Sequence, residues 1–392
     1  MSTRVVPGLA REIRRYGSLD ANACLNCGCC TVVCDLSSGS AAFPRKPIRL
    51  ALLGLRDLLR RSLDPWLCHD CRDCSTFCPR EARPAEAMAT LRRYLAAQYD
   101  VTGLASLIQR SKLWAISVLV LTALLVLALA YGYHQVEVGL SGSDLLTMPM
   151  GLEHMFGTIT VFTRVVLLIP LVLLLAGGWR MHRMALGGIR IPLRSYGAEA
   201  KTFLLHMVTQ RRMKECPQEE RRRAWAGHWL LALSFAAMSV ILFFLLRWFQ
   251  TDAILPLWNP QRWLGYLIAA VMIAVPAQML VKRLRSAEGR AFARAEDLTL
   301  PILILLTAVS GMAVHVARYQ ELALTAHLAY AIHIAISVPL LVIELPFGKL
   351  SHALYRPLAI YFLAVRERAL AVTKLAPAGA GAPETIEEEG AA

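Results

Sequence analysis

Charged residues are scarce in this chain of 392 residues: they make up 18% of it, while hydrophobic residues make up 56%. That balance, with a mean hydropathy of +0.47, excludes an intrinsically disordered protein and argues against an ordinary soluble enzyme of this length. Acidic residues are the scarcer kind, 28 against 42 basic ones, so the formal net charge is +14. A basic excess of this size indicates either a nucleic-acid ligand or a membrane surface.

The ten cysteines are too few for a disulfide-stabilised scaffold of this length. Almost all of them lie between residues 24 and 78. Thiols clustered at short spacing indicate metal ligands before they indicate disulfides. A further absence concerns residues 1–23, which lack an apolar core long enough for a cleavable signal peptide.

Long apolar runs dominate the chain after about residue 110. We place six of them at 112–133, 156–178, 225–249, 261–281, 298–319 and 326–347. Each is long enough to cross a hydrocarbon core of about 30 Å as a helix. Lipid cannot satisfy free backbone polar groups, so these runs are predicted to be transmembrane helices. Buried helices of a large soluble core are the disfavoured alternative, because six runs share this length.

The basic residues alternate between the connectors of these runs. Connector 179–224 carries eleven Lys and Arg residues and 282–297 carries five, whereas 134–155 has none and 250–262 has only Arg262. The positive-inside rule places the two basic connectors on the cytoplasmic side of the inner membrane. With six spans, both termini are then cytoplasmic. Topology accounts for the positive charge, and no nucleic-acid partner is expected.

Two cysteine runs share one spacing, C-x2-C-x2-C-x3-C, and Pro79 follows the second. This spacing is typical of a ferredoxin with two 4Fe-4S clusters, in which the fourth cysteine of each run binds the other cluster. The predicted ligands are Cys24, Cys27, Cys30 and Cys78 for cluster 1, and Cys68, Cys71, Cys74 and Cys34 for cluster 2.

Zinc and disulfides are the alternatives for these thiols. A repeated run of four cysteines is not the usual zinc spacing, and disulfides are rare in a reducing compartment. Cys29 is left over and is interpreted as a small packing residue, whereas Cys216 lies in the basic connector without a partner of its own. Between the two runs, 50–63 is apolar at helical spacing and predicts a helical insert.

Histidines in or near the spans are candidate haem ligands, because ionisable groups in a membrane are costly and histidines of neighbouring helices can hold a cofactor between them. His228 and His352 share the inner level, where we predict one haem b. His333, with His315 or His154, shares the outer level and predicts a second. His333 and His352 cannot ligate the same haem, since a continuous helix between them would rise about 28 Å.

Other polar groups near the spans receive weaker interpretations. Arg164 and Glu344 are candidates for pairing with haem propionates or contacting a quinone, and each serves equally well in a structural ion pair. The remaining histidines are interpreted as hydrogen-bonded bundle residues: His134, His182, His206 and His327.

Residues 20–100 resemble the C-type iron–sulfur subunits of heterodisulfide reductases, on the stretches FPRKPIRLALLGLRDLL and PWLCHDCRDCSTFCP. The six-span part, which ends in ELPFGKLSHALYRP, resembles two membrane cytochromes b, the E-type subunits of heterodisulfide reductases and the nitrate reductase gamma subunit. The last span of that gamma subunit holds two haem histidines, which His333 and His352 match with one extra residue between them. Pro339 and Pro346 lie in the interval, so a kink or π-bulge there would absorb it. An earlier span of the gamma subunit holds two further haem histidines. His228 matches the first of them, but Met238 stands at the position of the second, so the second ligand of the outer haem stays open.

The fusion of both parts resembles the quinone-interacting membrane-bound oxidoreductase family, over roughly 15–365. The resemblance implies electron exchange between menaquinone or ubiquinone and cytoplasmic flavin-containing subunits, which are related to the A-type subunits of heterodisulfide reductases and work with adenylylsulfate reductase in sulfur metabolism. Thr31 follows Cys29–Cys30, so the Cys-Cys-Gly motif of a heterodisulfide-reducing site is absent. The chain alone is not expected to reduce heterodisulfides.

These observations predict an all-α protein. It has a cytoplasmic, helical two-cluster ferredoxin-like head at 1–110, a six-helix transmembrane di-haem cytochrome b bundle at 111–365, and a disordered tail at 366–392. The predicted function is electron transfer between the quinone pool and a flavin-containing partner through haems b and two 4Fe-4S clusters. The alternatives are the equivalent subunit of another heterodisulfide-reductase-like or sulfite-reductase-linked membrane complex, and a transporter or sensor. A transporter or sensor is disfavoured because the spans hold few acidic residues, chiefly Glu344.

Overall fold

The computed structural model describes most of the chain. The described residues are 4–20, 22–37, 42–133, 135–136, 150, 152, 156–214, 219–285 and 295–375. All regular secondary structure within them is helical, so the predicted all-α fold is confirmed. His134, His154 and Cys216 lie outside the described residues.

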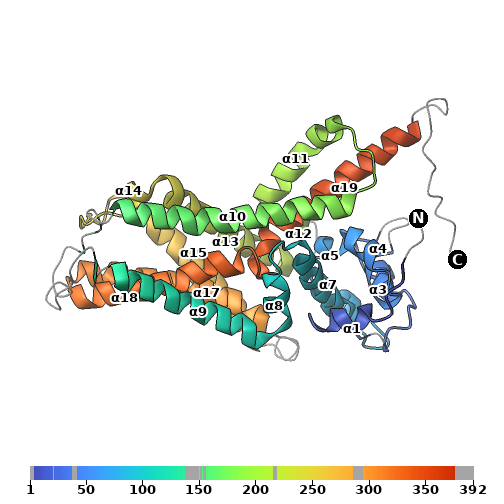
Figure 1. Cartoon of the computed structure of the whole chain (residues 1–392), viewed down its shortest axis with the longest axis horizontal. Coiled ribbons are helices and arrows are strands. Elements are labelled where there is room, and N and C mark those ends of the chain that lie inside the picture. The colour runs from blue at the N-terminus through green and yellow to red at the C-terminus, as the bar shows by residue number, and fades with distance from the viewer. Residues whose placement is uncertain are drawn as a thin grey trace.

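The head packs short helices around α7 (Figure 1). The central helix α7 is Pro84–Tyr99, and the short helices are α1 (Leu9–Arg14), α2 (Cys29–Val32), α3 (Arg45–Leu52), α4 (Arg56–Arg61), α5 (Asp64–Leu67), α6 (Asp73–Thr76) and α8 (Leu104–Arg110). Pro84 lies in the first turn of α7, where a backbone N–H has no acceptor within the helix. Proline therefore costs no hydrogen bond at this position. Buried residues lie on nearly every side of α7. Its Tyr94 packs edge-on against Tyr16, with the ring centroids 5.5 Å apart. α7 is therefore the central helix of the head.

The insert between the cysteine runs forms two helices, α3 and α4, separated at Gly54. Gly54 has φ +74°, and a Cβ there would lie 2.5 Å from the backbone oxygen of Val6. Only glycine fits this left-handed, close approach. The apolar pattern at 50–63 therefore predicts the helical state correctly, while the glycine divides it into two helices.

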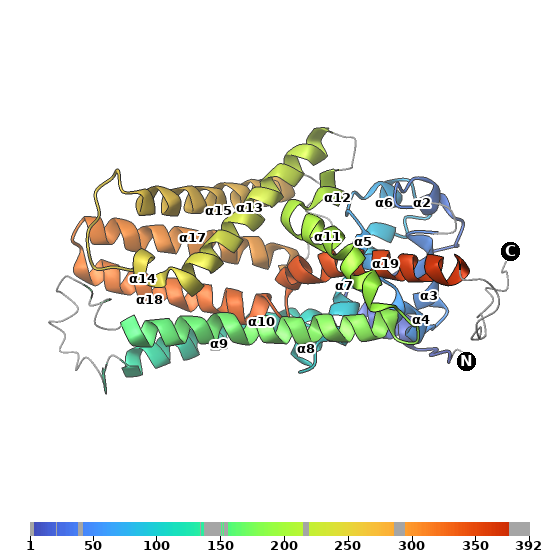
Figure 2. The same cartoon turned by 90° about the horizontal axis from the view of Figure 1, so that it is seen from above.

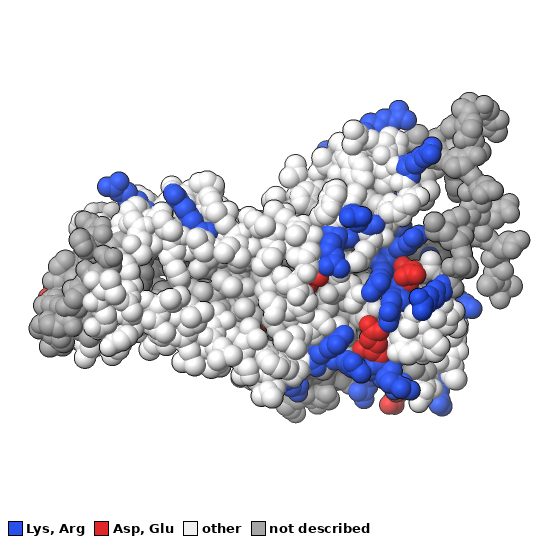
Figure 3. Space-filling model, viewed as in Figure 1, with Lys and Arg blue, Asp and Glu red and all other residues white. Residues whose placement is uncertain are grey.

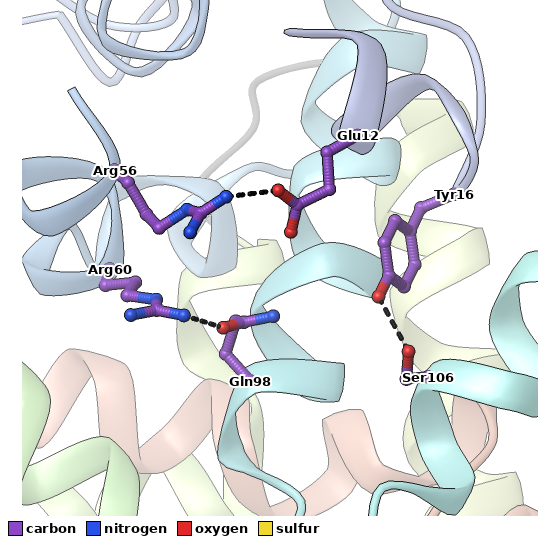
Figure 4. A network of polar contacts seen from close by, with 6 residues as sticks. All are labelled: Glu12, Tyr16, Arg56, Arg60, Gln98 and Ser106. Carbon is purple, nitrogen blue, oxygen red and sulfur yellow. Dashed lines mark hydrogen bonds and ion pairs between the residues drawn. The ribbon is translucent and has the colours of Figure 1, made fainter. Parts of the chain in front are cut away.

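Polar contacts tie the head helices to the segment that enters the bundle (Figure 4). Arg56 of α4 forms an ion pair with Glu12 of α1. The Tyr16 hydroxyl, just after α1, lies 3.0 Å from the Ser106 hydroxyl of α8. Because α8 leads directly into the first apolar helix, these contacts join the N-terminal helices to the start of the bundle.

The six predicted apolar helices are present. The segments long and apolar enough to span a membrane are Lys112–Tyr133 (α9), Phe156–Leu186 (α10), Arg222–Phe244 within α13 (Glu219–Phe244), Pro260–Arg285 (α15), Leu298–Tyr319 within α17 (Ala295–Tyr319), and Ala323–Glu344, which joins α18 (Ala323–Pro339) to the π-helix η3 (Leu340–Glu344). α13, α15, α17, α18 and α9 pack as successive neighbours, and α10 covers η3 and α13 (Figures 1 and 2). The third span ends at Phe244, before the predicted 249, and α14 (Leu246–Phe249) follows as a separate turn.

The sixth span does not continue into the helix that follows it. The π-helix Leu340–Glu344 lies in the interval where the extra residue predicted a kink or π-bulge. A turn and the 3-10 helix η4 (Lys349–Ser351) come next, and α19 (His352–Leu375) then begins. The rise of about 28 Å predicted between His333 and His352 assumed one continuous helix, and this interruption removes that assumption. The distance between His333 and His352 therefore depends on the geometry of this turn and is not given by the rise of a single helix.

The head, α11 (Leu193–Thr209), α12 (Arg211–Lys214) and α19 all lie at one end of the bundle (Figure 2). Lys and Arg gather over this end, while the side of the bundle in view is almost free of charge (Figure 3). α19 runs through Leu375, so 366–375 is helical, whereas the predicted tail began at 366. Residues 376–392 lie outside the described residues.

Close approach of α10 and α19 predicts a stability effect. A Cβ on Gly177 would lie 2.1 Å from the Tyr355 hydroxyl. Tyr355 is 2% exposed, and Trp66 and Tyr99 hold its ring edge-on. Gly177→Ala is therefore expected to destabilise the detergent-solubilised chain by about 1–3 kcal/mol, the usual cost of overpacking. Thermal denaturation followed by tryptophan fluorescence measures the effect. Gly157→Ala on the same helix, with open space around its Cβ, is the matched control.

Candidate functional site

Both cysteine runs adopt the same backbone path. Asn26 and Asp70, each just before the second cysteine of a run, have left-handed φ values of 56° and 58°. Gly28 and Arg72, each just after it, are left-handed as well, and each caps a one-turn helix, α2 or α6. Left-handed residues turn the chain sharply, so the three closely spaced thiols of each run bend around a common centre.

The fourth thiol of each run lies with the other run, as the spacing predicts. One cavity is lined by Cys24, Cys27 and Cys30 together with Cys78. Burial, together with the nearby thiols of Cys68 and Cys71, raises the pKa of Cys34 to about 11. The structure therefore brings each predicted ligand set together, and binding of a cluster by these sets stays a prediction.

The donor set fits an iron–sulfur cluster. Backbone N–H groups point at two of the sulfurs: Asp70 N lies 3.4 Å from Cys68 Sγ, and Ala82 N lies 3.3 Å from Cys78 Sγ. Hydrogen bonds to cysteine sulfur are one of the ways a protein sets a cluster's potential. Among the described residues, no three Cys, His, Asp or Glu side chains converge on a single-ion position.

Cys29 is not a packing residue. Its side chain is exposed, and its Sγ lies 3.6 Å from that of Cys27, which is also exposed. The interpretation from sequence is therefore wrong, because Cys29 follows the left-handed Gly28 at the start of α2 and that turn directs it outward. The first cysteine set accordingly reaches the surface of the head at Cys27.

His228 and His352 face each other at the head end of the bundle. His228 lies on α13, and His352 is the first residue of α19. Their ring centroids are 5.9 Å apart. Two imidazoles that share one metal along an axis have centroids about 6 Å apart, since each metal–nitrogen bond is about 2 Å. The separation therefore fits one metal ion, such as a haem iron, between the rings.

The hydrogen bonds of this pair select the nitrogen that stays free. His228 Nδ1 lies 2.6 Å from Oε1 of Gln210, and His352 Nδ1 lies 2.5 Å from the carbonyl oxygen of Lys349. Both acceptors require an N–H at Nδ1, so each Nε2 carries the lone pair. Burial, and then the neighbouring His228, lower the pKa of His352 to about 3, which favours the neutral form that binds metals. A second group that orients the ring in this way is usual for metal-ligating histidines.

Of the outer candidates, the structure describes His333 and His315, and these two rings engage different partners. His333 Nδ1 lies 3.1 Å from the carbonyl oxygen of Thr307, and its ring lies against Gly311 of α17. His315 is one turn further along α17, where its Nε2 lies 2.7 Å from the Tyr266 hydroxyl. The Nε2 of His315 is therefore engaged by Tyr266. Among the described residues, none forms a hydrogen bond with Nε2 of His333, and the other candidate partner, His154, lies outside them.

Glu344 faces the chain's own backbone. It is 7% exposed, and its Oε2 accepts a hydrogen bond of 3.0 Å from the backbone N–H of Lys349. This contact holds the turn that ends at His352, which favours a structural role over contact with a propionate or quinone. Arg164 lies exposed on α10. Two of the histidines interpreted as bundle residues behave as expected: His182 Nε2 lies 2.8 Å from the Tyr196 hydroxyl, and His327 Nδ1 lies 2.9 Å from the carbonyl oxygen of Ala323.

Two polar groups of this region are missed by reasoning from the sequence. Gln210 orients His228, and Arg356 Nη2 lies 3.1 Å from Nδ1 of His69, next to Cys68. The one available signal was the spacing of Arg356, four residues after His352 and therefore on the same face of a helix. No sequence pattern links either residue to its partner.

Known proteins match the head. The family of 4Fe-4S dicluster domains matches residues 20–82. A protein of Archaeoglobus profundus, named for its likeness to the C-type subunits of heterodisulfide reductases, is 35% identical over 104 residues, which cover 26% of this chain and 55% of that protein. An iron–sulfur C-type subunit of the CoB–CoM heterodisulfide reductase of Methanocaldococcus jannaschii is 42% identical over 74 residues, 19% of this chain and 39% of the relative. The chain thus spans about half, or less, of the length of these curated relatives. No solved structure matches it.

Proposed function

We propose that this chain is a membrane electron-transfer subunit that connects the quinone pool, through haems b and two 4Fe-4S clusters, to cytoplasmic flavin-containing subunits. The observation that carries the proposal is the presence of two kinds of candidate redox site at one end of a six-helix membrane bundle. The paired cysteine sets lie in the head, and the His228–His352 pair lies where the bundle meets it. The similarity of the head to C-type subunits of heterodisulfide reductases supports iron–sulfur electron transfer.

Different residues of the chain would serve the haem and the clusters. A haem between His228 and His352 would accept and donate single electrons. Gln210 and the Lys349 carbonyl hold the two imidazoles in the tautomer that leaves each Nε2 free. In the head, backbone N–H groups at Asp70 and Ala82 stabilise negative charge on the cysteine sulfurs. Transfer between the two clusters then needs no movement, since the fourth ligand of each comes from the run of the other.

Cluster 1 is where electrons would leave for a partner. Three large apolar side chains near its cysteines are strongly exposed: Leu25 by 66%, Val32 by 87% and Phe77 by 62%. Apolar side chains around an exposed redox centre favour docking of another protein. The partner we propose is a flavin-containing protein related to the A-type subunits of heterodisulfide reductases, acting with adenylylsulfate reductase. The names of the relatives support the alternative, a heterodisulfide-reductase-like complex. Isolation of the native complex separates the two assemblies.

A spectroscopic experiment tests the proposal. The purified chain is expected to contain two haems b by pyridine haemochrome and about eight iron atoms in clusters. A short-chain menaquinol should reduce the haem bands in a reduced-minus-oxidised spectrum. An unchanged spectrum with quinol, in a preparation that dithionite does reduce, would contradict the quinone link. Absence of haem would leave the iron–sulfur head and remove the cytochrome part of the proposal.

A further inference from the structure

Arg356 stands between the inner histidine pair and the second cysteine set. It follows His352 by four residues on α19, so both side chains lie on one face of the helix about 6 Å apart along its axis. Its Nη2 donates to Nδ1 of His69 across 3.1 Å. His69 directly follows Cys68, the first thiol of the second set. One side chain thus connects the helix that starts at a candidate haem ligand to the loop that carries a cluster ligand.

We propose that Arg356 is a positioning residue for electron transfer between the inner histidine pair and cluster 2. It holds the Cys68 loop against α19, and its charge raises the reduction potential of that cluster. The inference rests on the proposed function, because it assumes a cluster at Cys34, Cys68, Cys71 and Cys74.

Packing around Arg356 makes this junction rigid. α19 lies beside α5, the helix that ends just before Cys68 (Figure 2). Tyr355 packs edge-on against Trp66 of α5, with ring centroids 5.5 Å apart. The Cys68 loop is therefore attached to α19 by an aromatic contact on one side of Arg356 and by the Arg356–His69 hydrogen bond itself. A fixed separation between two redox centres is what fast electron transfer requires.

Electrostatics at the junction favours a shared cation. Burial, and then the neighbouring Arg92, lower the pKa of Arg356 to about 10, so it remains protonated at neutral pH. The nearby Cys68 and Asp70 raise the pKa of Arg356, because both side chains are negative when ionised and lie close to the guanidinium. Reduction adds negative charge to a cluster, and a nearby cation stabilises the reduced form. Removing the cation should therefore lower the potential.

Redox titration of the full-length chain in detergent, followed by electron paramagnetic resonance, tests the inference. Cluster 2 is identified by the signal that Cys68→Ala abolishes. R356Q is expected to lower the equilibrium constant for its reduction about tenfold, equivalent to about 59 mV for a one-electron couple, with cluster 1 unchanged. R356K keeps the cation and is expected to stay within about twofold of the wild type. R368Q is the matched control, since it removes a cation of the same helix that pairs with Glu199.

Several results would overturn the inference. An unshifted cluster 2 potential in R356Q with full iron content would do so, as would an equal shift of both clusters or the same shift in R368Q. If R356Q loses cluster 2, then R356K must keep both the cluster and its potential, and its failure would show a packing role only. The proposed function fails differently: the wild-type chain would then lack the clusters altogether by iron analysis.

Discussion

His352→Ala is expected to remove one of the two haems b from the purified chain. His352 supplies one of two facing imidazoles whose centroids are 5.9 Å apart, and alanine offers no nitrogen to replace it. The remaining His228 would keep its bond to Gln210 but would have no second imidazole with which to hold a haem. The haem content by pyridine haemochrome should fall from about two to about one per chain. Reduction of the clusters by quinol should fall by at least about 10–100-fold, the loss caused by disturbing even the outer shell of a metal site.

His327→Ala on the sixth span is the matched control. His327 Nδ1 bonds the Ala323 carbonyl oxygen of its own helix, so its loss should leave the haem content unchanged. Both variants remove an imidazole of the chain and differ only in the pairing of that ring. A haem content of two in His352→Ala, with the chain correctly folded, would show that the His228–His352 pair is structural.

The second large effect concerns the crossed cysteine sets. Cys34→Ala is expected to reduce the iron content from about eight to about four atoms per chain, because three thiols hold a four-iron cluster less well than four. The electron paramagnetic resonance signal that disappears should be the one that Cys68→Ala removes. This follows because the thiol of Cys34 lies within electrostatic reach of Cys68 and Cys71 rather than completing its own run.

Cys29→Ala provides the control for this experiment. Cys29 is exposed and belongs to neither set, so its variant should keep both signals and about eight iron atoms. If Cys34→Ala instead removed the signal that Cys24→Ala removes, each run would hold its own cluster. That result would contradict the crossed arrangement and the inferred position of cluster 2 beside Arg356.

Some of the site was predictable from local pattern alone. The cysteine spacing predicts two sets of four thiols, because three closely spaced residues must bend around one centre and the fourth then points away. The level of His228 and His352 in the membrane follows from their positions relative to the apolar runs. The pattern could not reveal that His315 uses its Nε2 for Tyr266, because that bond joins helices 49 residues apart in the chain.

By itself, the sequence determined the six spans and the basic end of the bundle, and it predicts the composition of the thiol sets. These follow from short-range properties: run length, charge and spacing are all read within a few turns of chain. Only the tertiary structure decided that Gln210 orients His228, that Glu344 holds the turn before His352, and that Arg356 reaches His69 over a separation of 287 residues. Hydrogen-bonding side chains are compatible with many partners, and only the packing of α11 and of the head helix α5 against α19 selects among them.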